Sequence, residues 1–357
     1  MRKRLRELGY EVGRLPAGPS CSLVDVPGVR VGHVTLHQGD SVRTGVTAVL
    51  PHGGNLHAEK VPGASHVING YGKATGLTQL AELGTLESPV LLTNTLAVGA
   101  VWEGGMRHLL ELNPEAGRDG DTVNVVVGEC FDGWLSDARA LPVRPEHALE
   151  AIAAASEEPP AEGAVGAGTG TTCFGFKAGV GSASRTVDGG LVLGCLIVSN
   201  FGARRDLHML VGTEAGDRRV GADAADPRGG SIMIVLGTDA PLSDRQLRRV
   251  AARATFGLGR AGSFASSGSG EYVIAFSTAH RLPHRAPESI VEVSLLRDDS
   301  PEVRQLFEAA GEATHEAILN SLCVAEPMDG RDGRRVEAFP YELLPAALGV
   351  NAEAGQA

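Results

Sequence analysis

Apolar runs with the length of β-strands recur along the chain and are separated by turns rich in glycine and proline. Two of them, TVNVVV at 122–127 and LVLGCLIV at 191–198, are apolar throughout. Strands of this kind are typical of sheets that are covered on both faces. We expect strands at 29–35, 44–50, 90–93, 122–127, 191–199, 231–237, 271–277 and 290–296.

Helical patterns alternate with these strands. Ser243 and Gln246 form a capping box before LRRVAARATFGLG, and Ser300-Pro301 supplies a cap and a first-turn proline before EVRQLFEAAGEATHEAILNSL. In the second segment, apolar residues recur at helical spacing, which predicts one face against a core. Shorter helices are expected at 73–83, 96–112 and 146–156. The mixture predicts the α/β class, with sheets sandwiched between helical layers.

Composition and charge narrow the class of protein. The 357 residues are 43% hydrophobic and 21% charged, which is typical of a globular protein. A formal charge of −11 argues against nucleic-acid binding, which needs clustered basic residues. The basic run MRKRLR at the N-terminus is expected to be a solvated tail. Without an apolar stretch of membrane-spanning length or a secretory signal core, the expected location is the cytoplasm.

The five cysteines are odd in number, scattered and never arranged as CxxC, which predicts reduced and mostly buried thiols. Cys130, beside Glu129, is the one candidate for a reactive thiol. His33 and His37 fall in a strand-like segment instead of a helix, so we expect no metal site. We expect no cofactor.

The glycine-rich segment GAGTGTTCFGFKAG at 166–179 superficially resembles a phosphate-binding loop. Its lysine, Lys177, comes one residue late after Gly175, and no serine or threonine follows to bind magnesium. The spacing therefore argues against nucleotide binding. It favours a loop that lines a substrate site or packs against another subunit.

The dipeptide Gly230-Ser231 closes a charged, glycine-rich segment at 211–230, expected to be an exposed loop, and opens the apolar run SIMIVLGTDAP. A serine hydroxyl can attack the preceding glycine carbonyl where the backbone is bent, and hydrolysis of the ester leaves a serine with a free α-amine. That amine titrates near neutral pH and can serve as a base for its own hydroxyl. The alternative is a glycine turn that leads into a strand.

Two further segments carry candidate chemistry. Ser269 and Glu271 are two residues apart before an apolar strand, a spacing that puts both side chains on one face. Asn200 follows the apolar run LVLGCLIVS, where its amide could donate to an oxyanion. A surface turn at 266–271 and a capping role for Asn200 are the alternatives.

Six segments in order, DVPGVRVGHVTL, VRTGVTAVLP, ESPVLLTNTLAVGA, VGAGTGTTCFGFKAGVGSASR, GGSIMIVLGTDAPL and GSGE, resemble the family of L-aminopeptidase D-Ala-esterase/amidase and the β-peptidyl aminopeptidases. The resemblance implies one αββα domain over 1–357, a homotetramer, and self-cleavage into an α chain 1–230 and a β chain 231–357. It also implies that Ser231 is the nucleophile, that Ser269 and Glu271 assist it, and that Asn200 is an oxyanion donor. The expected activity is hydrolysis of N-terminal residues from short peptides, amides or esters.

One departure from the family pattern lies at Phe131, where some relatives carry a tyrosine that helps the oxyanion site. A phenyl ring cannot donate that hydrogen bond. The substrate amine needs an anionic partner, for which Glu129, Asp132 and Glu271 are candidates.

Three rival functions stay open. An amidase of the nylon-oligomer type would use the same chemistry, although its nucleophile is typically a threonine after asparagine. An inactive binding or assembly relative would show neither cleavage nor turnover. An acyltransferase would transfer the acyl group to an added amine in preference to water.

Overall fold

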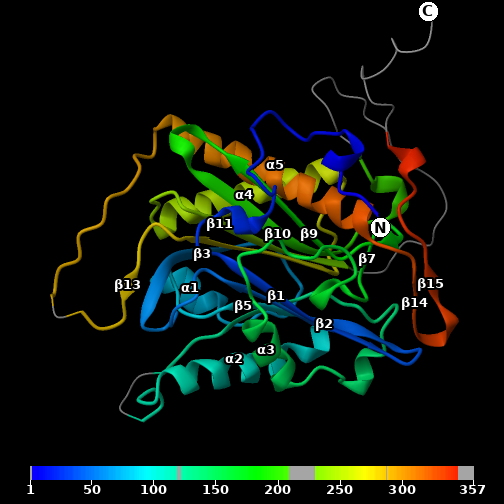
Figure 1. Ribbon diagram of the computed structural model, residues 1–357, viewed down its shortest axis with the longest axis horizontal. Helices are drawn as coiled ribbons and strands as arrows, with labels where there is room; N and C mark the ends of the chain where they lie inside the picture. The colour runs from blue at the N-terminus through cyan, green and yellow to red at the C-terminus, as the bar shows by residue number, and fades with distance from the viewer. Residues whose placement is uncertain (1, 119–121, 209–229, 287, 345–357) are drawn as a thin grey trace, which may run out of the picture.

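Two β-sheets lie face to face in the middle of the molecule, and helices cover both outer faces (Figure 1). The computed structural model describes residues 2–118, 122–208, 230–286 and 288–344. The smaller sheet has the order β1-β2-β5-β6. Its strands are β1 (Arg30–Gln38), β2 (Val42–Leu50), β5 (Val90–Thr93) and β6 (Val126–Glu129).

The larger sheet has the order β13-β3-β12-β11-β10-β9, and β4 pairs with β3 beside this path. Its strands are β3 (Glu59–Gly70), β4 (Thr85–Leu86), β9 (Val180–Thr186), β10 (Val192–Asn200), β11 (Gly230–Thr238), β12 (Ser269–Ser277) and β13 (Leu282–Pro283). Two small hairpins, β7 (Thr172–Cys173) with β8 (Phe176–Lys177) and β14 (Met328–Asp329) with β15 (Arg335–Val336), complete the strands.

Three apolar clusters explain the four layers. One packs α4 (Asp244–Ala261) and α5 (Pro301–Val324) on the outer face of the larger sheet. A second fills the space between the sheets, and a third packs α2 (Val98–Leu112) and α3 (Pro145–Ala153) on the smaller sheet. The short α1 (Leu77–Leu83) follows β3. The structure thus confirms the expected αββα sandwich (Figure 1).

Helix starts follow the local signals in the sequence. The Ser243 hydroxyl accepts from the Gln246 N–H, and the Gln246 side chain accepts in return from the Ser243 N–H, so α4 begins with the predicted capping box. Ser300 caps α5, whose first residue is Pro301. None of the described helices is long and apolar enough to cross a membrane.

Two strand predictions were wrong. The strand expected at 122–127 begins only at Val126, and the segment 290–296 forms no strand. Instead, residues 288–296 belong to an extended connection between β13 and α5 that projects from the body (Figure 1). Alternating apolar residues such as Val291 and Val293 are exposed there, because periodicity reports side-chain spacing but does not supply a pairing partner.

The N-terminal basic run was also predicted wrongly. Leu5 is fully buried, and the Arg4 guanidinium lies 2.7 Å from the Glu162 carboxylate. Arg6 binds Glu316 of α5, with 2.7 Å between Nε and Oε1. The first residues therefore fasten onto the outer helical layer instead of extending into solvent.

Candidate active site

Ser231 lies at the start of β11, with its side chain on the face between the two sheets. Met233 and Val235, two and four residues further on, belong to the core between the sheets, and strand alternation places Ser231 on their side. In the larger sheet, Ser231 pairs with Asn200 of β10 and with Gly270 of β12. Its side chain is nearly buried, since the residue is only 3% exposed.

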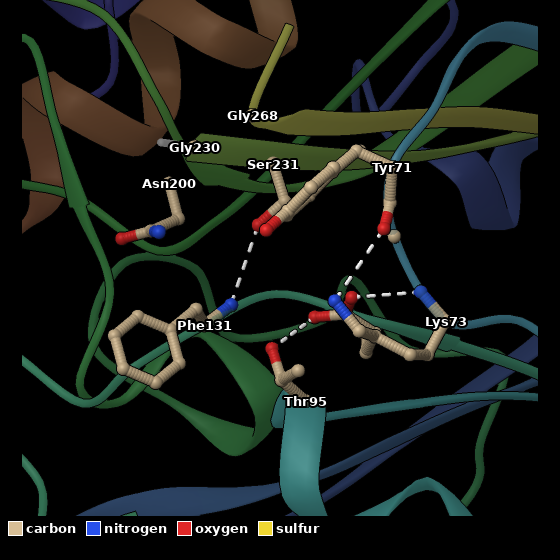
Figure 2. Close-up of a pocket in the computed structure, with 11 residues that line it drawn as sticks. Tyr71, Lys73, Thr95, Phe131, Asn200, Gly230, Ser231 and Gly268 are labelled. Carbon is tan, nitrogen blue, oxygen red and sulfur yellow. Dashed lines mark hydrogen bonds between the residues drawn. The ribbon is translucent and has the colours of Figure 1, made fainter. Parts of the chain in front are cut away.

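A cavity of about 280 Å³ opens at this end of the sheets (Figure 2). Five residues singled out from the sequence line it, namely Glu129, Phe131, Asn200, Gly230 and Ser231. Asn200, Gly230 and Ser231 come from the larger sheet, whereas Glu129 ends β6 of the smaller sheet. The space between the sheets is therefore the place where these distant segments converge.

Phe131 contributes a backbone donor. Its N–H donates to the Ser231 hydroxyl, with 3.3 Å between nitrogen and Oγ. The phenyl ring turns away from Ser231 and is 49% exposed (Figure 2). Position 131 therefore supplies a main-chain donor to the Ser231 hydroxyl although its side chain cannot donate. A backbone donor of this kind cannot be identified from the type of side chain.

Asn200 is held by the segment that resembled a phosphate loop. Its Oδ1 accepts from the Thr172 N–H at 3.1 Å, which leaves Nδ2 as the donor end of the amide. None of the residues 166–179 is among the described residues that line this cavity, and the alternative that the segment packs against another subunit stays a prediction. The segment contributes to the site through the Thr172 N–H, which holds the Asn200 side chain.

Glu129 is nearly buried and accepts hydrogen bonds on both carboxylate oxygens. The Lys73 N–H donates to Oε1 at 3.0 Å, and the Thr95 hydroxyl donates to Oε2 (Figure 2). Donors to both oxygens hold the carboxylate in one orientation. A fixed carboxylate at a cavity wall is a suitable partner for a cationic group.

Ser269 and Glu271 lie on the opposite face of the larger sheet from the Ser231 hydroxyl. On β12, Tyr272 and Ile274 face the space between the sheets, and Val273 and Ala275 face the helices, so the odd-numbered Ser269 and Glu271 share the helix side. Ser269 pairs with Gly230 across the strands. Glu271 pairs with Ile232, so the two residues flank the Gly230-Ser231 peptide on the neighbouring strand, but neither is among the residues that line the cavity.

The Glu271 carboxylate is completely buried, and neither oxygen has a hydrogen-bond partner among the described residues. Burial raises the pKa of Glu271 above its ordinary value, and the nearby Ser269 and Asn69 side chains partly counter that rise. Such a group holds a proton more readily than an exposed carboxylate.

Asp132 and Cys130 lie behind the cavity wall. Asp132 is completely buried and does not line the cavity, which argues against Asp132 as the partner of a substrate amine. Burial raises the pKa of Asp132 to about 7. The Cys130 thiol donates to the Val198 carbonyl at 3.1 Å, and burial raises its pKa strongly, so it is an inert thiol. All five cysteines are free and buried, as predicted.

The sequence interpretation missed six lining residues, which are Tyr71, Gly72, Lys73, Thr95, Gly268 and Gly270. Three of them follow β3, a strand that we did not predict. Gly72 and Gly270 pass so closely that a Cβ on Gly270 would lie 2.6 Å from the Gly72 backbone. Thr95 could have been found, because it follows the predicted strand 90–93 as Asn200 follows its own.

Among the described residues, no group of three or more histidine, cysteine or acidic side chains is placed to hold a metal ion. His33 instead shares a hydrogen bond with the Thr47 hydroxyl at 2.9 Å.

Comparison with known proteins agrees with this arrangement. Residues 22–336 match Peptidase family S58. The chain is 38% identical to a β-peptidyl aminopeptidase, BapA, of Sphingosinicella microcystinivorans, over 97% of this chain and 91% of that protein. Among solved structures, it is similar to the PH0078 protein from Pyrococcus horikoshii OT3, with a TM-score of 0.87 and 45% identity over 95% of this chain and 97% of that one.

A second solved structure, L-aminopeptidase D-Ala-esterase/amidase from Ochrobactrum anthropi, is 32% identical, with a TM-score of 0.84 and 96% of each chain covered. It is described as a prototype of the serine aminopeptidases and a variant of the Ntn hydrolase fold. The family match spans both sheets and the cavity between them. The chain belongs to Peptidase family S58 and is an aminopeptidase with the fold of that Ntn hydrolase variant.

Proposed function

We propose that this aminopeptidase activates itself by cleaving the Gly230-Ser231 bond and then uses Ser231 as its nucleophile. The observation that carries the proposal is the position of Ser231, at the start of β11 and inside a cavity also lined by Glu129 and Asn200. A serine in a strand interior could not become a chain terminus without breaking the sheet. Ser231 is the second residue of β11, so cleavage before it would leave the rest of the strand paired.

In the processing step, the Ser231 Oγ attacks the carbonyl carbon of Gly230. The C–N bond breaks as the proton from Oγ passes to the Ser231 nitrogen, which leaves an ester between Gly230 and the Ser231 oxygen. Water then hydrolyses the ester to a Gly230 carboxylate, a Ser231 hydroxyl and a free α-amine. The products are the α chain 1–230 and the β chain 231–357.

In turnover, the same Oγ attacks the carbonyl carbon of a substrate amide or ester. The Phe131 N–H, which donates to Oγ at 3.3 Å, and the Asn200 amide, which lines the same cavity, are the proposed donors to the oxyanion. The proton from Oγ passes through a base to the leaving amine, and water then hydrolyses the acyl-enzyme. The carboxylic acid product is released, and the Ser231 hydroxyl is regenerated.

Ser269 and Glu271 would act on the new amine instead of on the hydroxyl. Ser269 pairs with Gly230 on the neighbouring strand, and paired strands lie about 4.8 Å apart. Cleavage would therefore expose the α-amine beside these two side chains. Glu271, buried and with a raised pKa, can exchange a proton with that amine and so prepare it as the base for Oγ.

Glu129 is the proposed partner of the substrate's free amine, which limits the enzyme to residues at an N-terminus. Both of its oxygens are held in place, and it faces the same cavity as Ser231. The named β-peptidyl aminopeptidase suggests that β-residues belong to the substrate range, together with the short peptides, amides and esters of α-amino acids. A homotetramer in the cytoplasm completes the proposal.

Denaturing mass spectrometry tests the processing step. The purified protein should give two fragments in place of one 37.0 kDa chain, and the smaller should begin with SIMIV. Ser231→Ala should remain one chain and hydrolyse no amino-acid p-nitroanilide, because the attacking oxygen is gone. An intact chain with full activity would rule out this function, whereas absence of both cleavage and turnover would favour the inactive binding relative.

A further inference from the structure

Lys177 ends the hairpin strand β8 and is completely buried. Its ammonium donates to three backbone carbonyls, those of Gly168 at 3.3 Å, Thr171 at 2.9 Å and Ala178. These three acceptors use all three N–H groups of a charged lysine. No acidic side chain forms an ion pair with Lys177 in the part of the chain that the structure describes.

This arrangement is a poor way to stabilise a fold. Burial lowers the pKa of Lys177 to about 7, since a cation loses its hydration in the interior. The equally buried Arg185 shows the usual solution, because Glu312 and Glu316 pair with it at 3.0 and 2.7 Å. Stability of the fold therefore does not explain why Lys177 is buried with carbonyl partners alone.

Two of the carbonyl partners adjoin residues that hold the end of β10. Thr171 precedes Thr172, whose N–H donates to the Asn200 Oδ1 at 3.1 Å. Ala178 precedes Gly179, whose carbonyl accepts from the Ser199 N–H at 3.0 Å. One ammonium therefore links the two backbone segments that grip Ser199 and Asn200.

We propose that Lys177 is a positioning residue that orients the Asn200 amide for oxyanion stabilisation. It clamps the 168–171 turn against Ala178, and the turn presents the Thr172 N–H to Oδ1, which fixes the Asn200 amide at the wall of the cavity. This inference rests on the proposed role of Asn200. Lys177 touches neither substrate nor reacting atoms.

A double-mutant cycle tests the inference. Lys177→Met, Asn200→Ala and the double variant are compared by kcat and KM on one amino-acid p-nitroanilide. Each kcat is expressed per cleaved chain, counted by the fragment that begins with SIMIV. Loss of an oxyanion donor lowers kcat by about 10²–10³-fold, and we expect Lys177→Met to lower it by at least about tenfold with KM nearly unchanged.

The double variant distinguishes positioning from general stabilisation. If Lys177 acts through Asn200, Lys177→Met should lower kcat by less than about twofold further in the Asn200→Ala background. The control is Lys60→Met, which removes another largely buried ammonium, paired with Glu87 at 2.5 Å near the far end of β3. It should lower the thermal midpoint and leave kcat unchanged.

Each outcome decides a different point. An unchanged kcat in Asn200→Ala would refute the proposed oxyanion donor itself, and an unchanged kcat in Lys177→Met beside a strong Asn200→Ala effect would refute only the inference. Equal losses from Lys177→Met in both backgrounds would also overturn it. If Lys177→Met does not fold, Thr172→Pro is the second variant, because it removes the N–H that donates to the Asn200 Oδ1. It should reproduce the loss of kcat, and an unchanged kcat would refute the positioning of Asn200 through Thr172.

Discussion

Glu129 and Glu271 are two buried carboxylates that flank the same nucleophile from different directions, and their surroundings are opposite. Glu129 comes from the smaller sheet, lines the cavity and accepts from Lys73 and Thr95. Glu271 comes from the larger sheet, lies outside the cavity lining and has no hydrogen-bond partner among the described residues. The same type of side chain is therefore hydrogen-bonded at one position and without a hydrogen-bond partner among the described residues at the other.

The difference teaches how environment assigns roles to identical groups. Donors on both oxygens fix the orientation of the Glu129 carboxylate at the cavity wall, which suits it to bind a substrate amine. Burial raises the pKa of Glu271, which suits it to give and take a proton. Substitutions that remove charge but keep shape should therefore change different kinetic constants at the two positions.

Glu271→Gln should produce the largest effect of this comparison. Removal of a proton-exchanging group lowers kcat by about 10²–10⁴-fold, while KM should stay within about threefold because the group lies outside the cavity lining. Steady-state kinetics on processed enzyme measures both constants. A raised KM with normal kcat would show that Glu271 binds substrate instead.

Glu129→Gln should act mainly on KM. A hydrogen bond to a charged group contributes about 1.5–3 kcal/mol, so KM for an amino-acid p-nitroanilide should rise by about 10–100-fold. The matched control is an N-acetylated substrate, which has no cationic amine. Wild type should discriminate strongly between the two substrates, and if the variant keeps that discrimination, the amine binds elsewhere.

Thr95→Val tests the donors of Glu129 with a smaller expected effect. The substitution removes the hydroxyl that donates to Oε2 and leaves the Lys73 N–H on Oε1. With one donor remaining, KM should rise by about three- to tenfold and kcat should hold. Thr95→Ser, which keeps the hydroxyl, should restore the wild-type KM, and failure to do so would point to a packing role.

Asp132→Asn extends the comparison to a third buried carboxylate and should change stability more than activity. The folded-state pKa of about 7 exceeds the ordinary value of 3.8, so the folded chain holds a proton that the unfolded chain releases between these limits. Wild-type stability should therefore fall as the pH rises from about 4 to about 7. The variant cannot ionise and should lose that part of the dependence.

Thermal unfolding at pH 5 and pH 8 measures the effect of Asp132→Asn. The difference between the thermal midpoints of variant and wild type should shift by several degrees in favour of the variant at the higher pH. Because Asp132 does not line the cavity, kcat and KM should stay within about twofold. A strong loss of kcat would show that the chain next to Phe131 depends on this carboxyl group.

Strand and helix positions were largely predictable because the local spacing of apolar residues and the capping residues determine them. The strand 90–93 and the caps at Ser243 and Ser300 lie where the pattern placed them. The segment 290–296 also carries apolar residues at alternating positions but joins no strand of the described residues, since pairing is a property of two segments and not of one. The missed β3 removed Tyr71 and Lys73 from the predicted site.

The sequence by itself determined the fold family, the proposed nucleophile at Ser231 and its neighbours Asn200, Ser269 and Glu271, because ordered motifs and strand ends are local features. Only the tertiary structure decided which face each side chain takes, which carboxylate receives donors, and that the Phe131 backbone N–H points at Ser231. These depend on strand register and on the distance between two sheets. Both are set by long-range packing, which no single segment encodes.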